Sequence, residues 1–275
     1  MIGVETRYYM NVRVDNLLLD TALEQVESLI EQSKEDGVPR QVFFTNVHSI
    51  HLARKDTEFR RYLDKADLVL PDGSGLKIAG KVLEMPILEN LNGTDFTPKV
   101  CRMAETGKWS VYLLGAREDV VKRCSEKLKE RFPNLSLIGY HNGYFSKNEE
   151  DEIVEEINKK KPDILLVALG QPYQEKWIAR NANRLNTHIC LAVGGLFDFL
   201  AGAMKRAPLW MRKLGIEWFH RFLQDPKSKW DRILIEIPVF LSLVLQEKVI
   251  SLTSKRNLNQ LRWIFNGQRD RYIRS

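Results

Sequence analysis

The sequence predicts an α/β fold: a Rossmann-like, mostly parallel sheet with helices on both faces, followed by a helical C-terminal appendage. Short apolar runs rich in Val, Ile, Leu and aromatic residues alternate with amphipathic stretches through residue 200. Alternation of this kind is typical of parallel sheets that are covered by helices. Beyond residue 200 the alternation stops, and two helical stretches follow each other with no strand between them.

Six runs are expected to be strands because they are apolar and most of them end at Gly or Pro. They span residues 41–45, 67–70, 110–114, 135–140, 163–169 and 188–193. Amphipathic periodicity predicts helices over residues 46–55, 74–83, 94–105, 118–131, 149–160 and 172–184. Ligands of such sheets bind at the carboxyl ends of the strands, so the residues that follow each strand are the first candidates for a site.

The chain divides into an α/β catalytic domain, residues 1–200, and a basic helical appendage, residues 201–275. The appendage has 15 Lys and Arg against 6 Asp and Glu, whereas the first 200 residues have 27 against 30. This asymmetry indicates an anionic partner for the appendage, either nucleic acid or a membrane with anionic lipid. Helices are expected over residues 207–223 and 226–246.

An apolar run of thirteen residues, 233–245, lies in the appendage and is interrupted by Glu236 and Pro238. It is too short to cross a bilayer of about 30 Å, so we expect it to lie in a membrane interface. The alternative is a helix that only completes the hydrophobic core. The chain shows no secretory leader, and its three cysteines are widely spaced, which suits a reducing cytosol.

Several signatures of cofactor and metal sites are missing from the sequence. There is no GxGxxG, GxxxxGK[ST], HExxH or GxSxG motif, and no Cys/His pair at ligand spacing. There is also no Asp-x-Asp at a strand end, where nucleotide-sugar enzymes usually clamp a metal and a diphosphate. We therefore expect neither a metal site nor a cofactor.

Polar residues follow the first two expected strands. Thr45 and Asn46 end the first strand, and Asp72 ends the second beside a glycine turn and a helix start. A carboxylate at this edge can act as a general base, but Asp is also a good helix N-cap. A similar cluster precedes the helix at 94–105, where capping by Asn92 or Thr94 is again the simpler interpretation. That cluster consists of Asn92, Gly93, Thr94 and Asp95.

Three later strand ends carry further candidates. Gly115 opens a turn where a phosphate could meet backbone N–H groups, although a tight turn explains it equally well. Gln171, Gln174 and Glu175 begin a helix, and amides there can recognise a sugar or a nucleobase. The paired glycines Gly194 and Gly195, with Asp198 after them, permit a close approach by a ligand or form a demanding turn. The candidates thus gather at one edge of the expected sheet.

These segments, taken in order, resemble the WecG/TagA/CpsF glycosyltransferases, which form glycosyltransferase family 26. The similar blocks extend from about residue 6 to residue 245. They are TNVHSIHLARKD (45–56), ADLVLPDGSGL (66–76), ENLNGTD (89–95), VYLLGA (111–116), ILLVALGQPYQEKWI (164–178), VGGLFDFLAGAMKRAP (193–208) and LGIEWFHRFLQDP (214–226).

The resemblance implies an inverting, metal-independent enzyme of bacterial cell-surface polysaccharide or teichoic acid synthesis. Such an enzyme moves a sugar from a UDP-sugar to an undecaprenyl-diphosphate-linked acceptor sugar. The resemblance implies a cytoplasmic protein that binds peripherally to the inner face of the plasma membrane through its appendage. It leaves open whether the chain forms a homo-oligomer.

The resemblance also assigns roles to individual residues. Asp72 matches the proposed general base, and Asn46 lies beside the reacting sugar. Gln174 and Asp198 match residues of the nucleotide-sugar pocket, and some members contact the nucleotide where Tyr144 stands. Arg221 matches the arginine to which contact with the diphosphate is assigned.

One position departs from the teichoic-acid members, which have threonine where this chain has Phe44. The transferred sugar is therefore left open between N-acetylmannosamine, its uronic acid and another hexose. Two other classes of function remain. A non-catalytic nucleotide-sugar-binding regulator would keep the glycine turns without needing Asp72. A nucleic-acid-binding protein would use the basic appendage with its tryptophans, but Trp218 and Phe222 are at helical spacing, which favours packing over stacking with bases.

Overall fold

The computed structural model describes residues 4–224 and 226–253, without the side chains of residues 213, 221, 227–229, 232 and 233. The core is a six-stranded parallel sheet in the order β4-β3-β8-β7-β5-β6. Its strands are β3 (Arg40–Thr45), β4 (Leu68–Pro71), β5 (Ser110–Gly115), β6 (Ser136–His141), β7 (Ile164–Ala168) and β8 (Ile189–Ala192). All six expected strands are confirmed, each end within one residue of its expected position.

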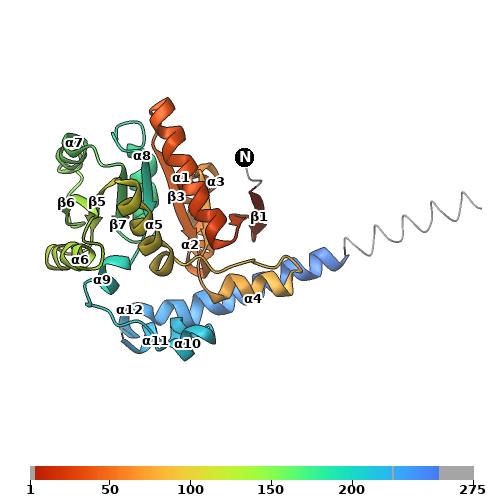
Figure 1. Ribbon diagram of the computed structural model, residues 1–275. Coiled ribbons are helices and arrows are strands. Elements are labelled where there is room, and N and C mark those ends of the chain that lie inside the picture. Colours follow the sequence, from red (N-terminus) through yellow and green to blue (C-terminus); the bar gives the residue numbers. More distant parts are fainter. Residues whose placement is uncertain (1–3, 225, 254–275) are drawn as a thin grey trace, which may run out of the picture.

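The six expected helices of the first 200 residues are also confirmed. They are α2 (Val47–Lys55), α4 (Ser74–Val82), α5 (Gly93–Gly107), α6 (Glu118–Arg131), α7 (Glu150–Lys160) and α8 (Tyr173–Asn181). Helices cover both faces of the sheet, as expected (Figure 1). One face packs on residues of α5 and α6, and the other on residues of α2, α4, α7 and α8.

Several elements had no counterpart in the sequence analysis. A hairpin, β1 (Glu5–Tyr9) and β2 (Val12–Asn16), precedes the sheet, and its turn places Met10 and Asn11 at positive φ. The other additions are α1 (Leu19–Asp36), α3 (Thr57–Lys65) and the short α9 (Leu196–Leu200). The strands of the hairpin carry several charged residues, so their pattern differs from that of the apolar core strands.

The appendage departs from expectation at one point, because the single helix predicted over 207–223 is two helices. They are α10 (Leu209–Lys213) and α11 (Glu217–Gln224). Gly215 between them has a φ of +74°, which residues other than glycine rarely adopt. Ser74 Oγ donates to the carbonyl of Gly215 at 2.5 Å, which fixes the break against α4.

The second helix of the appendage begins with α12 (Pro226–Asp231), passes through a π-helical turn, η1 (Arg232–Glu236), and continues to residue 253. We call residues 237–253 the C-terminal helix. Its Phe240 and Val244 are buried in the core, so part of the appendage does complete the core. The rest of the basic segment, residues 254–275, lies outside the described residues. Within the described part of the chain, no helix combines the length and apolarity needed to cross a membrane.

Candidate functional site

The carboxyl ends of β3, β7 and β8 are joined by a network of side-chain hydrogen bonds. Asn46 caps α2, because its Oδ1 accepts from the Ser49 backbone N–H at 3.0 Å. Ser49 Oγ lies 3.1 Å from Gln171 Oε1, and Gln171 Nε2 donates to the carbonyl of Phe44 at 3.0 Å. The loop after β7 is thereby tied to the end of β3.

Gln174 and Glu175 extend the network to β8. Gln174 Nε2 donates to Glu175 Oε1 at 2.8 Å, and Gln174 Oε1 accepts from the Gly194 backbone N–H at 3.0 Å. Gln171 Nε2 lies 3.3 Å from the same oxygen of Glu175. Both amide side chains therefore have fixed orientations, and the amide of Gln174 holds the glycine turn rather than facing outward.

The carboxyl group of Glu175 is fully buried, and its second oxygen has no hydrogen-bond partner. Burial raises the pKa of Glu175 to about 7, although the bonds from Gln174 and Gln171 oppose this shift. The side chains of Gln174 and Thr45 are also buried, so these three residues lie behind the rim of the sheet. They are placed where they support the rim, and their contacts with the substrate stay a prediction.

Asp72 stands at the rim, directly after β4. Its backbone N–H donates to the carbonyl of Thr45 at 2.8 Å, which places it beside the end of β3. The N-cap position of α4 is Gly73, at φ 98°. Asp72 therefore stands one residue before the N-cap position that the capping interpretation gave it. Asp95 raises the pKa of Arg206 most, and Glu217 and the partly exposed carboxylate of Asp72 raise it further.

The loop before α5 lies next to Asp72. Gly73 N–H donates to Asn90 Oδ1 at 2.6 Å, and Leu91 N–H donates to the carbonyl of Pro71 at 2.9 Å. Asn92 caps α5 by accepting from the Asp95 N–H at 3.0 Å, so the capping interpretation holds there. Thr94 is half-buried, and Gly93 is buried against the ring of Phe44.

Asp95 connects the core to the appendage. Its carboxylate pairs with both terminal nitrogens of Arg206, and Arg212 lies 4.0 Å away. The guanidinium of Arg206 lowers the pKa of Asp95. Sequence analysis did not identify Arg212, because nothing in the local sequence shows which carboxylate an appendage arginine meets.

A second connection joins His48 and Glu236. His48 follows Asn46 in the first turn of α2, and its Nδ1 lies 2.8 and 3.0 Å from the two carboxylate oxygens of Glu236. Glu236, the one carboxylate in the apolar run 233–245, is buried. Its contact with His48 explains why a carboxylate is present there, because the contact holds the appendage on the core. The position of His48 after a strand was the only signal for this contact.

The glycine turn after β8 is open on its outer side. Gly194 has φ 55°, which explains the first glycine as a conformational need. Gly195 is exposed and has an ordinary φ of −75°, and a Cβ there would come no closer to another residue than 4.0 Å from Asp198 Oδ2. Asp198, half-buried on α9, thus borders an accessible stretch of backbone.

Of the remaining expected residues, Gly115 lies at the same edge of the sheet, where it pairs with Ala168 at the end of β7, and Tyr144 lies farther away. Gly115 is required by its neighbour, since a Cβ there would lie 2.4 Å from the carbonyl oxygen of Ala168. Tyr144 is 78% exposed and follows β6, the edge strand opposite to β4 and Asp72. Arg221 lies on α11, and its side chain is outside the described residues.

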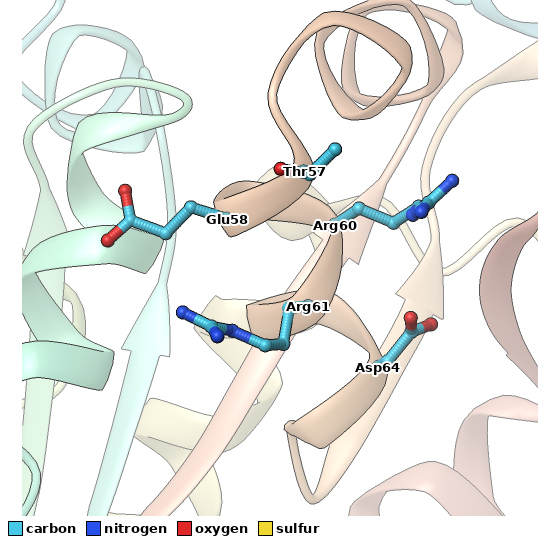
Figure 2. Close-up of a pocket in the computed structure, with 5 residues that line it drawn as sticks. All are labelled: Thr57, Glu58, Arg60, Arg61 and Asp64. Atoms are coloured by element: carbon cyan, nitrogen blue, oxygen red, sulfur yellow. The ribbon is translucent and has the colours of Figure 1, made fainter.

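A depression on α3, shown in Figure 2, lies outside this group. It is lined by Thr57, Glu58, Arg60, Arg61 and Asp64. Glu58 pairs there with Lys176 and Arg180 of α8, which explains the depression as part of helix packing. Among the residues that the structure describes, no three His, Cys, Asp or Glu side chains gather as a metal site would require.

The fold is that of an α/β protein with a parallel sheet, and ligands of such proteins bind at the carboxyl edge of the sheet. Residues 7–254 match the model of the Glycosyl transferase WecG/TagA/CpsF family, which includes the helices of the appendage. The chain therefore belongs to this family and is a glycosyltransferase that transfers a hexose, as the resemblance implied.

Two relatives illustrate the similarity. A protein of Bacillus subtilis (strain 168) is 32% identical over 245 residues, which is 89% of this chain and 93% of the relative. A protein of Staphylococcus aureus (strain MW2) is 30% identical over 241 residues, or 87% and 92%. Both are named N-acetylglucosaminyldiphosphoundecaprenol N-acetyl-beta-D-mannosaminyltransferase.

Proposed function

We propose that this protein transfers N-acetylmannosamine, its uronic acid or another hexose from a UDP-sugar to an undecaprenyl-diphosphate-linked acceptor. The acceptor sugar is N-acetylglucosamine, as in the names of the two relatives. The observation that carries the proposal is the position of Asp72, a partly exposed carboxylate that directly follows β4 at the carboxyl edge of the sheet.

The reaction is a single displacement with inversion. As the acceptor hydroxyl attacks the anomeric carbon, the carboxylate of Asp72 takes the hydroxyl proton, and UDP leaves with the electrons of the breaking bond. Retention would need a second carboxylate as nucleophile. Asp95 is engaged by Arg206, which makes it a poor nucleophile. One base therefore suffices.

The departing diphosphate needs positive charge or oriented N–H groups. Arg206 comes from the appendage, and Asp95 holds it near Asp72; Arg221, by the resemblance, supplies a second cation. The exposed backbone of Gly195 offers its N–H group at the end of β8. In this proposal no metal ion and no cofactor takes part, and Asn46 orients the reacting sugar from the end of β3.

The departure at Phe44 does not itself select the donor. Its side chain is buried in the core and packs edge-on against Phe96, with ring centroids 6.0 Å apart. It therefore cannot touch a sugar. A screen of UDP-sugars against a short-chain N-acetylglucosamine-diphosphate-lipid, read by mass spectrometry, identifies the donor; absence of any transfer product would contradict the proposal.

The same screen tests the alternative of a non-catalytic nucleotide-sugar-binding regulator. A regulator would bind UDP-sugars without releasing UDP, with or without the acceptor. An enzyme releases UDP, faster when the acceptor is present. Slow UDP release without acceptor already favours the enzyme.

The appendage is proposed to bind the inner face of the plasma membrane peripherally. It combines basic charge with exposed apolar side chains, among them Trp210, Trp218 and Trp230. Anionic headgroups attract nearby Lys and Arg, and apolar side chains enter the interface. Co-sedimentation with anionic liposomes should therefore be strong at low salt and should weaken as salt rises. No binding at low salt would rule out this part of the proposal.

A further inference from the structure

The outer face of α4 has the composition of a helix that lies on a membrane, although α4 belongs to the catalytic core. Its inner side chains Leu76 and Ala79 are fully buried. Its outer face exposes Lys77 and Lys81 together with Ile78 and Val82, and Ile78 is 53% exposed. Each pair is four residues apart, so the two lysines and the two apolar side chains form adjacent stripes. No acidic residue lies on the helix.

The C-terminal helix runs beside α4 along its whole length (Figure 1). Near the start of α4, a Cβ on Gly75 would lie 3.8 Å from the ring of Phe240. Just past its end, Lys248 Nζ lies 2.6 Å from Glu84 Oε1. The sequence offset is similar at both contacts, so the two helices are side by side and point in the same direction.

The C-terminal helix also presents an apolar stripe on its exposed side. Leu241, Leu245, Val249 and Leu252 are each close to half exposed or more, at spacings of three or four residues. The side that faces the core carries Phe240 and Val244 instead. The helix is therefore apolar on two sides, of which the core covers one.

We infer that α4 and the C-terminal helix together form one membrane-binding face, whose partner is a bilayer surface that contains anionic lipid. The inference rests on the proposed function for its lipid-linked acceptor, and it adds a part of the catalytic core to the proposed membrane contact. Charge complementarity selects the partner: Glu84 is already paired with Lys248, so Lys77 and Lys81 remain as the cations of this face.

This face determines where the chemistry occurs. α4 begins two residues after Asp72, and its nine residues span about 14 Å. When α4 lies along the interface, Asp72 is held at the level of the headgroups, where the diphosphate of a lipid-linked acceptor also lies. A soluble acceptor does not need this placement.

The test compares charge and apolar variants of α4 in the full chain. Vesicles of phosphatidylcholine, with and without phosphatidylglycerol, serve as the probe in co-sedimentation. Lys77→Glu with Lys81→Glu should lower partitioning to the anionic vesicles roughly tenfold or more. Ile78→Ser with Val82→Ser should lower partitioning to both kinds of vesicle. Lys122→Glu with Lys129→Glu on α6 is the control, with the same charge change on the opposite face of the sheet, and should have less effect.

Turnover separates this inference from the proposed function. The α4 variants should keep wild-type turnover with a short-chain, soluble acceptor and lose it with an acceptor embedded in vesicles.

Wild-type partitioning of both α4 variants would overturn the inference, as would an equal loss of partitioning in the α6 control. The inference would also be overturned if light scattering showed a dimer that the α4 substitutions dissociate while vesicle binding stays unchanged. If the charge-reversed variant does not fold, Lys77→Gln with Lys81→Gln gives the same comparison. Failure of the wild type with every soluble acceptor would contradict the proposed function, while vesicle binding would still decide the role of α4.

Discussion

The rim network and the α4 side of the molecule are built in different ways. At the rim, Gln171, Gln174 and Glu175 join three strand ends through buried or partly buried hydrogen bonds of 2.8 to 3.3 Å. The appendage, whose C-terminal helix lies beside α4, is attached by separate polar contacts such as His48–Glu236 and Arg206–Asp95, and its outer face is apolar and exposed. The first arrangement suits a rigid donor site, and the second suits a surface that meets a partner.

The comparison predicts that substitutions at the rim impair the reaction with any acceptor. Asp72→Asn should lower turnover by roughly 10²–10⁴-fold, because the acceptor hydroxyl loses its base. The fold and the affinity for UDP should remain, as measured by circular dichroism and calorimetry. Turnover near that of the wild type would remove Asp72 from the role of base.

Substitution of Glu175 should lower the free energy of unfolding more than substitution of nearby surface residues does. Glu175→Ala leaves the buried side-chain amide of Gln174 without its acceptor and removes one of the two acceptors of Gln171, which should cost about 1–3 kcal/mol of unfolding free energy. Glu175→Gln keeps an acceptor oxygen at the same place and is the matched control. Urea unfolding measures both, and equal losses would show that the hydrogen bonds are not the cause.

The stability of the wild type should fall with rising pH relative to that of Glu175→Gln. Burial raises the pKa of Glu175 from 4.5 in the unfolded chain to about 7 in the folded protein. Between these values the folded state holds the proton and the unfolded state does not, so stability decreases as pH rises towards 7 and is constant above it. The difference should be on the order of 3 kcal/mol over this window. A flat difference in urea unfolding between pH 5 and about pH 8 would contradict the buried carboxyl.

The ion pair between Asp95 and Arg206 should have the smallest effect on stability. Its carboxylate is half exposed, so Asp95→Asn should cost no more than about 1 kcal/mol. The same change should speed proteolytic cleavage of the appendage, because one attachment to the core is weakened. Asp119→Asn, which breaks a surface pair with Arg123 on α6, is the control and should not change the cleavage rate. Equal cleavage rates for both variants would contradict the attachment.

The strands and most helices around the sheet could be predicted because their pattern reflects burial directly. A run such as Leu68–Pro71 is buried at every position, and that is visible in the sequence. The hairpin was missed because its strands mix charged and apolar residues, although most of β2 is buried. Helix α3 was missed because it is largely polar and packs through few positions, such as Phe59 and Leu63. The break at Gly215 depends on a bond from Ser74, far away in the chain, which no local pattern reveals.

The candidate site was predictable as a region but not in its internal roles. Residues after strands meet at one edge of any parallel sheet, so Asn46, Asp72 and Asp198 could be named from their positions. That Gln174 holds Gly194, and that Gly73 rather than Asp72 occupies the N-cap position of α4, follows from tertiary contacts and backbone angles. Contacts of the appendage, such as His48–Glu236, join residues 188 positions apart and leave no trace in periodicity.

The division of labour between the rim and the α4 face is tested most directly by one turnover assay with two acceptors. Asp72→Asn and the variant with Lys77→Glu and Lys81→Glu are each supplied with a soluble short-chain acceptor and with the same headgroup embedded in anionic vesicles. We predict that Asp72→Asn loses turnover with both acceptors, whereas the α4 variant loses it with the embedded acceptor alone. Equal losses of the α4 variant with both acceptors would contradict the account.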